Sequence, residues 1–160
     1  MKHIRQWNTL GEAKALIPPW IYRQLREHIT DDTITPWCGQ FCLMMITGAT
    51  FDEACVATSQ IGGTTKEDLM NGLRLLGYQY SWFSVANHGM SQQSGDHKRI
   101  RGQMAIAHLR LADSDWSHWL VYDKGHWLDP GQLEPGYLYG AAYWIDEYIV
   151  IDKCLAIDHV

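Results

Sequence analysis

The sequence predicts an α+β fold in which helices come first and an antiparallel sheet follows. Residues up to about 77 carry helix caps and apolar stripes, whereas the later residues form runs of aromatic and β-branched side chains. The two kinds of segment do not alternate, which favours segregated layers over a parallel α/β sheet. A chain of 160 residues, 46% hydrophobic and 19% charged, suits a single core. We therefore expect one domain over residues 1–160, helical over about 9–77 and sheet-forming over about 78–158.

The first helical segment is expected over residues 9–29, with a break at its two adjacent prolines. The stretch "PPWIYRQLREHI" places proline in the first turn of a helix, where an N–H is not needed. Trp20, Ile21 and Leu25 are expected to face inward. The polar stretch "TDDTITP" over residues 30–36 then predicts a loop.

A buried helix is expected over residues 38–47, because "CGQFCLMMIT" is apolar nearly all round. Gly48 is suited to end this helix, and Thr50 followed by two acidic residues predicts the start of another. A further helix is expected to start at Thr64 or Thr65, again followed by acidic residues. The apolar stripe of that helix consists of Leu69, Leu73 and Leu76.

Strands are expected after residue 77. The runs rich in aromatic and branched residues are "YQYSWFSV", "QMAIAHLRL", "SHWLVYDK", "HWLDP" and "YWIDEYIVIDKCLAI". Between the first two, residues 86–102 are polar with no period, which predicts a long exposed loop and a candidate flap. The stretch Asp123-Lys124-Gly125 between the third and fourth runs predicts a hairpin turn.

The composition argues against several classes of function. The formal charge is −5 and the isoelectric point about 5.8, which disfavours nucleic acid as an obligate partner. No segment approaches the roughly 18 apolar residues of a membrane-spanning helix, and the first twenty residues lack the pattern of a signal peptide. We therefore expect a cytoplasmic protein whose cysteines are thiols rather than disulfides. The four cysteines are Cys38, Cys42, Cys55 and Cys154.

The stretch "TPWCGQFCLMM" contains two cysteines four residues apart. A thiol becomes a good nucleophile when its pKa falls, and a helix N-terminus favours the thiolate. Cys38 opens the expected buried helix, whereas Cys42 lies one turn further in, where the helix dipole acts less. We therefore expect Cys38 to be the nucleophile, and Cys42, Cys55 and Cys154 to pack in the core.

A cysteine nucleophile needs a base, and the base needs a group that orients it. His118 starts an apolar strand-like run, and Asp129 ends the next one before a Pro-Gly turn. If His118 faces Asp129, the pairing centre of the hairpin lies near 123.5, since 118 + 129 = 247. This centre falls inside the expected turn, so the register predicts that the two side chains meet.

Four stretches in this order resemble the papain-like cysteine peptidases, nearest to the group that processes double-glycine leaders of bacteriocins and to its stand-alone relatives. They are "WCGQFCLMMITG", "GGTTKEDLMNGLRLLGY", "QMAIAHLR" and "SHWLVYDKGHWLDPG", and they span about residues 30–131. The resemblance implies a papain-like fold, with a central nucleophile helix in an N-terminal helical lobe that packs on a C-terminal antiparallel sheet. It also implies Cys38 as nucleophile, His118 as general base and acid, and Asp129 as the group that orients the imidazole.

The activity that the resemblance implies is hydrolysis of a peptide or isopeptide bond in a protein or peptide substrate, through a thioester and without a cofactor or metal. One position departs from the family pattern. The family has a glutamine six residues before the cysteine, whose amide helps to bind the oxyanion, and this chain has Asp32 there. An ionised carboxylate cannot donate a hydrogen bond. Either another donor completes the oxyanion hole, or the protein is a catalytically impaired relative that binds proteins or peptides. The candidate donors are the side chains of Thr33, Thr35, Trp37 and Gln40.

The same residues also suit two other kinds of site, a zinc site and the active site of a transferase. Cys38 and Cys42 with His118 or His126 supply enough ligands for zinc, but no second close pair of ligands follows the cysteine pair. A Cys-His-Asp transferase, such as an arylamine acetyltransferase or a transglutaminase-like enzyme, uses the same triad in chains that are usually larger. The tryptophans near these residues either pack in the core or line a cleft. They are Trp37, Trp116, Trp119 and Trp127.

Overall fold

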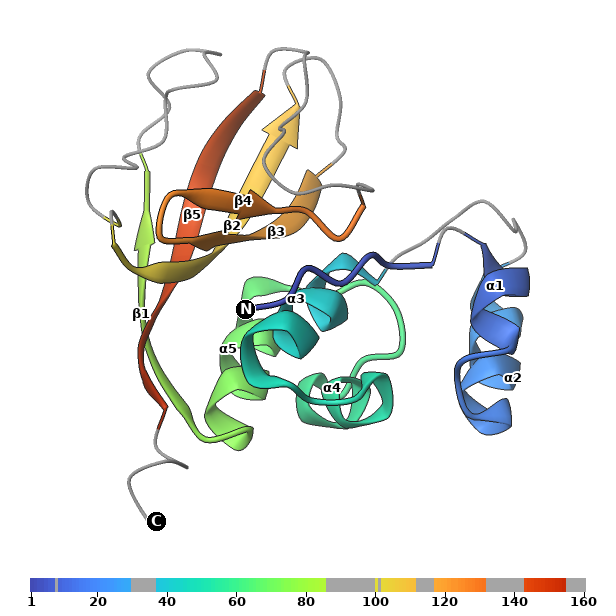
Figure 1. The fold of residues 1–160 in the computed structure, drawn as a ribbon. Helices are drawn as coiled ribbons and strands as arrows, with labels where there is room; N and C mark the ends of the chain where they lie inside the picture. The colour runs from blue at the N-terminus through green and yellow to red at the C-terminus, as the bar shows by residue number, and fades with distance from the viewer. Residues whose placement is uncertain are drawn as a thin grey trace.

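The computed structural model of the protein describes residues 1–7, 9–29, 37–85, 100, 102–111, 117–131 and 143–154. Within them the architecture is α+β, with five helices followed by a five-stranded antiparallel sheet (Figure 1). The helices are α1 (Leu10–Lys14), α2 (Pro19–His28), α3 (Cys38–Thr47), α4 (Phe51–Thr58) and α5 (Lys66–Leu75). The strands are β1 (Tyr78–Ser84), β2 (Met104–Leu111), β3 (Ser117–Asp123), β4 (His126–Leu128) and β5 (Tyr143–Cys154). The predicted segregation of helices and strands is confirmed.

Helices α1 and α2 are separated where the adjacent prolines predict a break, and Pro19 is the first residue of α2. Ile21 and Leu25 are buried as expected, at 0% and 2% exposure. The expectation that Trp20 faces inward is wrong, since this residue is 42% exposed. Ile21 and Leu25 lie four residues apart and share one face of α2, whereas Trp20 is rotated away from that face.

Helices α3, α4 and α5 are short and have well-defined ends. Gly48, at φ 75°, ends α3 in the left-handed region that glycine adopts readily. Capping boxes open α4 at Thr50 and α5 at Thr65, so Thr65 is the one of the two predicted caps that is used. No single helix among those described is long and apolar enough to cross a membrane, and α3 and α4 pass that test only as a pair bent by 112°.

The sheet has the strand order β1-β5-β2-β3-β4, and its neighbouring strands are antiparallel. The expected hairpin joins β3 and β4, the strands that carry the predicted base and lead to its partner. Lys124 and Gly125 turn the chain at φ 50° and 95°, as a two-residue type I′ turn requires. The loop predicted over residues 86–102 lies outside the described residues, apart from Ile100 and Gly102.

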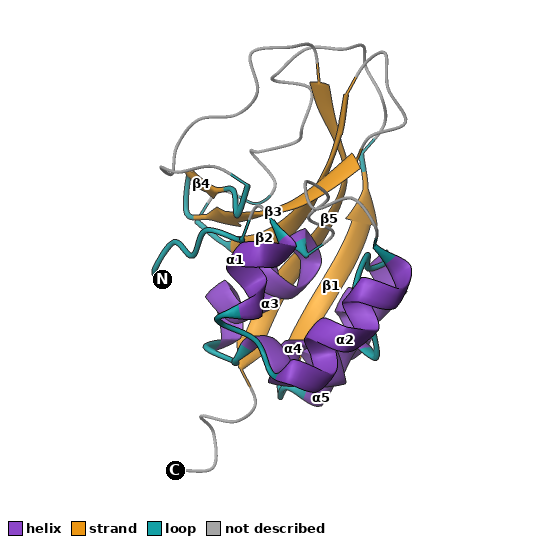
Figure 2. Cartoon of the chain, turned by 90° about the vertical axis from the view of Figure 1, so that its right-hand side faces the viewer, coloured by secondary structure: helices purple, strands orange, loops and turns teal. Residues whose placement is uncertain are grey.

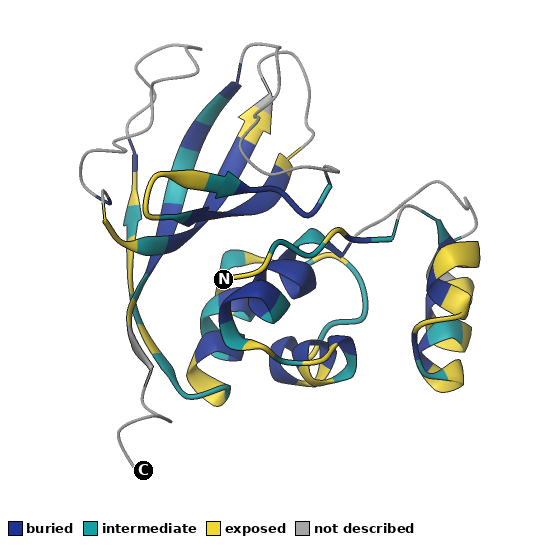
Figure 3. Ribbon diagram, viewed as in Figure 1, coloured by how far each residue is buried: buried dark blue, intermediate teal, exposed yellow. Residues whose placement is uncertain are grey.

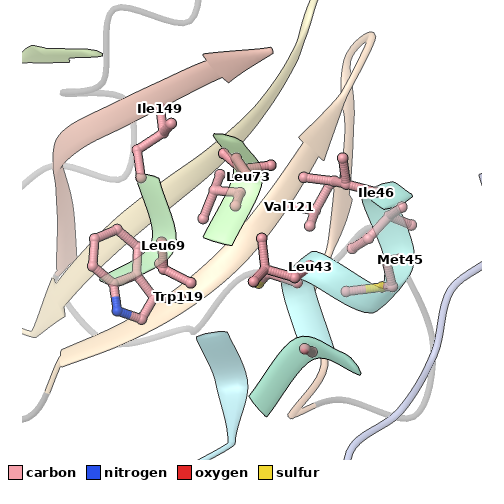
Figure 4. Close-up of a cluster of buried hydrophobic side chains, with 12 residues drawn as sticks. Leu43, Met45, Ile46, Leu69, Leu73, Trp119, Val121 and Ile149 are labelled. Carbon is pink, nitrogen blue, oxygen red and sulfur yellow. The ribbon is translucent and has the colours of Figure 1, made fainter. Parts of the chain in front are cut away.

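The helices α3, α4 and α5 gather on one side of the sheet, as Figure 1 and Figure 2 show from two directions. The core between them and the sheet includes Leu43, Ile46, Leu69, Leu73, Trp119 and Val121 (Figure 4). A second cluster lies on the other face of the strands and includes Ala105, Ala107, Leu109, Leu120 and Tyr122. A third cluster joins α1 and α2 to α3 and α4. Helix α3 is therefore buried along nearly its whole length (Figure 3).

The residue after Cys38 is a glycine because the chain at Thr64 passes directly against it. A Cβ atom built on Gly39 would lie 1.9 Å from Thr64 Oγ1 and 3.1 Å from Leu69 Cδ2. Trp119 Nε1 donates a 3.2 Å hydrogen bond to Thr64 O, which ties the same loop to β3. The close approach at Gly39 therefore joins the start of α3, the start of α5 and the sheet beside Cys38.

We expect Gly39→Ala to lower the free energy of unfolding by about 1–3 kcal/mol, the usual cost of overpacking. Gly63→Ala is the matched control, because a Cβ on Gly63 would meet nothing within 4 Å. Urea denaturation of both variants, followed by tryptophan fluorescence, measures the difference. Equal stability of the two variants would contradict the close approach at Gly39.

Candidate active site

Cys38 is the first residue of α3 and is partly exposed, whereas the next five residues of the helix are buried. The first turn of α3 contains no acidic residue. The positive end of the helix dipole at Cys38 therefore meets no opposing charge from its own helix. The predicted nucleophile thus combines access to solvent with a favourable local field.

His118 and Asp129 form a buried hydrogen bond on the β3–β4 hairpin. His118 is the second residue of β3, Asp129 directly follows β4, and they are 6% and 1% exposed. His118 Nε2 lies 2.6 Å from Asp129 Oδ1, which also accepts a 2.7 Å hydrogen bond from the Gly131 backbone N–H. Asp129 Oδ2 is buried and has no hydrogen-bond partner among the described residues. The carboxylate therefore depends on His118 and on the Gly131 amide for its stabilisation.

These two side chains meet, as predicted, but the predicted register is wrong by two residues. Val121 pairs with Leu128, and 121 + 128 = 249, so the pairing centre lies at 124.5 instead of 123.5. Extension of this register places Gly131 opposite His118, with Asp129 as the diagonal neighbour on the same face. A Cβ on Gly131 would lie 3.5 Å from His118 Nε2, so the glycine leaves room for the carboxylate to reach the ring.

Cys38 also lies close enough to His118 to favour the protonated ring. Because the Asp129 carboxylate can only accept, Nε2 carries the hydrogen of that bond, and Nδ1 is the nitrogen left for the thiol. Burial lowers the pKa of His118, but the hydrogen bonds with Asp129 and Cys38 outweigh this effect and raise the pKa to about 10. His118 is therefore protonated at neutral pH, between a sulfur and a carboxylate.

The other described cysteines lack this environment. Cys42 is fully buried, and burial together with the charges of Cys38 and Asp129 raises the pKa of its thiol well above the usual value. Burial raises the pKa of Cys55 to about 12. Both therefore remain neutral thiols at physiological pH, and their expected packing in the core is confirmed. The side chain of Cys154 lies outside the described residues.

Two of the oxyanion donors suggested by the sequence are already engaged in other hydrogen bonds. Trp37 is fully buried, and its Nε1 donates to Ile61 O at 3.2 Å. Gln40 Nε2 donates to two carbonyls, Gln60 O at 3.3 Å and Gly62 O at 2.7 Å. These bonds hold the loop before α5 against α3 and use the donors of both side chains. The remaining candidates, Thr33 and Thr35, lie outside the described residues together with Asp32.

Residues 1–7 form a strap that crosses the open end of the β3–β4 hairpin, at the residues that follow β4. No local sequence motif predicts this contact. His3 Nε2 lies 2.8 Å from Asp129 O. The Gln6 backbone N–H donates to Pro130 O at 2.7 Å. In Figure 1 the strap runs from the N-terminus between this hairpin and α3. Two residues with polar side chains that the sequence did not single out, His3 and Gln6, are thereby placed beside the turn that carries Asp129.

The strap also contacts the start of α3. Trp7 packs edge-on against Trp37, the residue before Cys38, with ring centroids 5.6 Å apart. Gln6, directly before Trp7, is only 6% exposed. The strap therefore lies between the helix that presents the thiol and the turn that presents the carboxylate, and it buries a glutamine there.

A second histidine–aspartate pair lies on the same sheet. His108 Nδ1 is 2.7 Å from Asp146 Oδ1, and the other oxygen of Asp146 accepts a hydrogen bond from Arg110 Nε. The His108 ring packs on Trp119, with centroids 4.4 Å apart. The pair belongs to β2 and β5 and not to the hairpin that carries His118 and Asp129. It does not include Cys38, and we assign it no catalytic role.

The tryptophans that flank the proposed residues pack in the core rather than line an open cleft, as far as they are described. Trp37 is fully buried and Trp119 is 6% exposed. Trp127 packs edge-on against Tyr122, with ring centroids 5.0 Å apart. Trp116 lies outside the described residues.

The part of the chain that the structure describes contains no set of ligands for zinc. No group of three or more His, Cys, Asp or Glu side chains there is arranged to hold a metal ion. Comparison with known proteins adds no candidate, since no protein-family model and no curated protein matches the sequence. The assignment of a function therefore rests on the geometry of Cys38, His118 and Asp129 and on the resemblance of the motifs.

The raised pKa of His118 predicts how stability depends on pH. The folded value of about 10 lies above the ordinary value of 6.5. The stabilisation is therefore fully present below about pH 6.5 and is lost as the pH rises towards 10. In Asp129→Asn the folded pKa of His118 falls, so this loss becomes smaller and ends at a lower pH.

Chemical denaturation across this pH range checks the prediction. Asp123→Asn is the control, because it removes a carboxylate from the same hairpin without touching His118. If wild type and Asp129→Asn lose the same free energy of unfolding between neutral and alkaline pH, the proposed link between His118 and Asp129 is wrong.

Proposed function

We propose that the protein is a thiol peptidase, which hydrolyses a peptide or isopeptide bond with Cys38, His118 and Asp129. The observation that carries the proposal is the buried hydrogen bond between His118 and Asp129, with Cys38 close enough to raise the pKa of the same imidazole. A thiol at a helix start, a protonated imidazole and a buried carboxylate in this order are the parts of a nucleophile, a base and an orienting group. A cysteine-bearing helix that packs on a sheet with the histidine and aspartate supports a papain-like organisation.

In the proposed reaction, His118 already holds the proton of Cys38 on Nδ1, and the Cys38 thiolate attacks the carbonyl carbon of the scissile bond. The His118 imidazolium then protonates the leaving nitrogen, the C–N bond breaks, and the acyl group remains on Cys38 as a thioester. A water molecule attacks the thioester while His118 takes its proton. The C–S bond breaks, the carboxylic acid leaves, and the sulfur and imidazole return to their first state. Asp129 holds the ring and stabilises its charged form throughout.

The tetrahedral intermediates carry an oxyanion, which needs hydrogen-bond donors. The backbone N–H of Cys38 is one candidate, because amides in the first turn of a helix have no partner within it. We assign the second donor to the side chain of Gln6. Gln6 is 6% exposed, its backbone N–H donates to Pro130 O beside Asp129, and the adjacent Trp7 packs on α3. Gln6 lies 32 residues before Cys38 in sequence (38 − 6 = 32), whereas the family pattern has a glutamine only six residues before.

Alkylation tests the proposed nucleophile. Near pH 7, iodoacetamide is expected to modify Cys38 about tenfold or more faster in the native protein than in His118→Ala, because an unassisted thiol is only a few per cent thiolate there. Peptide mapping by mass spectrometry identifies the modified residue.

Cys42→Ala is the matched control on the same helix, and it should leave the rate unchanged because Cys42 is fully buried. Native protein whose Cys38 resists alkylation between about pH 6 and 8 would exclude the peptidase. The binding-only alternative raised by Asp32 would then be the better explanation of the fold.

A comparison of two reactions tests the role of Gln6. We expect Gln6→Met to slow acylation by p-nitrophenyl acetate by roughly 10²–10³, since an oxyanion forms in that reaction. Alkylation by iodoacetamide should keep its wild-type rate, because displacement of iodide forms no oxyanion. The release of p-nitrophenolate and the loss of free thiol measure the two rates.

Arg5→Met is the control for the substitution, since Arg5 is an exposed residue of the same strap. An equal fall in both reactions would show that Gln6 supports the thiolate or the fold instead. An unchanged acylation rate would remove Gln6 from the oxyanion hole.

A further inference from the structure

The strap holds the turn that carries Asp129 from outside the hairpin. The ladder between β3 and β4 ends at Leu128, so the next residues are beyond its last cross-strand pair. Two consecutive carbonyl oxygens of the turn are instead bound by the strap. His3 Nε2 bonds Asp129 O at 2.8 Å, and the Gln6 N–H bonds Pro130 O at 2.7 Å.

A third hydrogen bond of this turn lies within the turn itself. The Gly131 N–H donates to Asp129 Oδ1, so this bond moves with the turn and cannot fix it relative to the ring of His118. The contact that requires alignment is the 2.6 Å bond between His118 Nε2 and Asp129 Oδ1. A displacement of about 1 Å near reacting groups is enough to change a rate about a hundredfold. A restraint on the Asp129 backbone from outside the hairpin therefore affects the rate of the proposed reaction.

We propose that His3 is a positioning residue, which fixes the backbone of Asp129 so that its carboxylate stays aligned with the His118 ring. The inference rests on the proposed function, because it assigns His3 a role in preparing the same triad. His3 touches neither the thiol nor the substrate in this account. It acts through the Asp129 carbonyl.

The strap has an anchor that does not depend on His3. Trp7 packs edge-on against Phe41 of α3 and Phe51 of α4, with ring centroids 5.0 and 4.8 Å apart. Ile4 packs against the cores on both sides of α3. The strap should therefore stay in place when His3 alone is changed. This separates a loss of alignment from a loss of the strap.

The test compares three variants of the full chain. His3→Phe keeps a ring of similar size and removes the donor, whereas His3→Gln keeps an amide donor near the same place. Arg5→Ala is the control, because it changes an exposed residue of the strap. For each variant the alkylation rate of Cys38 by iodoacetamide is measured from about pH 5 to 9. The titration of the His118 ring is followed by NMR, and the midpoint of thermal unfolding is recorded.

We expect His3→Phe to alkylate Cys38 about threefold to tenfold more slowly at neutral pH, the range that one net hydrogen bond supplies. The His118 ring should titrate at a lower pH than in wild type, since a misaligned carboxylate stabilises the imidazolium less. His3→Gln should recover most of the rate, and Arg5→Ala should match wild type.

Two outcomes overturn the proposal, and both differ from failure of the proposed function. The first is an alkylation rate and a His118 titration in His3→Phe equal to those of Arg5→Ala. The second is a lower unfolding midpoint in His3→Phe with an unchanged pH profile, which shows a structural role alone. If His3→Phe does not fold, the same criteria apply to His3→Ala and to its comparison with His3→Gln. Failure of the proposed function appears instead as a wild-type Cys38 no more reactive than Cys38 in His118→Ala.

Discussion

The buried hydrogen bond between His118 and Asp129 is the interaction on which the candidate site depends. A carboxylate that is 1% exposed is costly unless it is paired, and one of its oxygens has no partner among the described residues. The His118 ring supplies the compensating charge, with Nε2 towards the carboxylate. That orientation leaves Nδ1 for Cys38 and so sets the geometry of the whole triad. Gly131 is part of the same constraint, because a Cβ there would lie 3.2 Å from Asp129 Oδ1, a tight contact.

Burial separates two cysteines that the motif alone does not distinguish. Cys38 and Cys42 lie four residues apart on α3, yet only Cys38 is partly exposed. The negative charges that make an imidazolium at His118 favourable have the opposite effect on Cys42, whose thiolate they oppose. The same charges that favour the imidazolium at His118 therefore help to keep Cys42 a neutral thiol. Gly39 contributes to this arrangement, because the absence of a Cβ lets Thr64 pack directly against the start of α3.

Features with a local cause could be predicted from the sequence, and features set by distant contacts could not. The ends of α3 and the capping boxes of α4 and α5 follow from residues within one turn of each helix end. The hairpin was predictable from Asp123-Lys124-Gly125, but its register was not. A two-residue turn at Lys124 and Gly125 moves the pairing centre by one residue. The predicted contact between His118 and Asp129 was still correct, because a shift of two residues leaves a side chain on the same face of the strand.

The strap marks the limit of arguments based on spacing. The family pattern places the oxyanion donor six residues before Cys38, and this chain has Asp32 there. That pattern holds only where the residues close to the helix start in space are also close to it in sequence. In this protein α1 and α2 intervene, and the chain that lies against Trp37 and the Asp129 turn comes from residues 1–7. Gln6 is placed there by the hydrogen bond to Pro130 and by the packing of Trp7, neither of which has a local sequence signal. In the proposed site, the second oxyanion donor is therefore assigned to Gln6 and not to position 32.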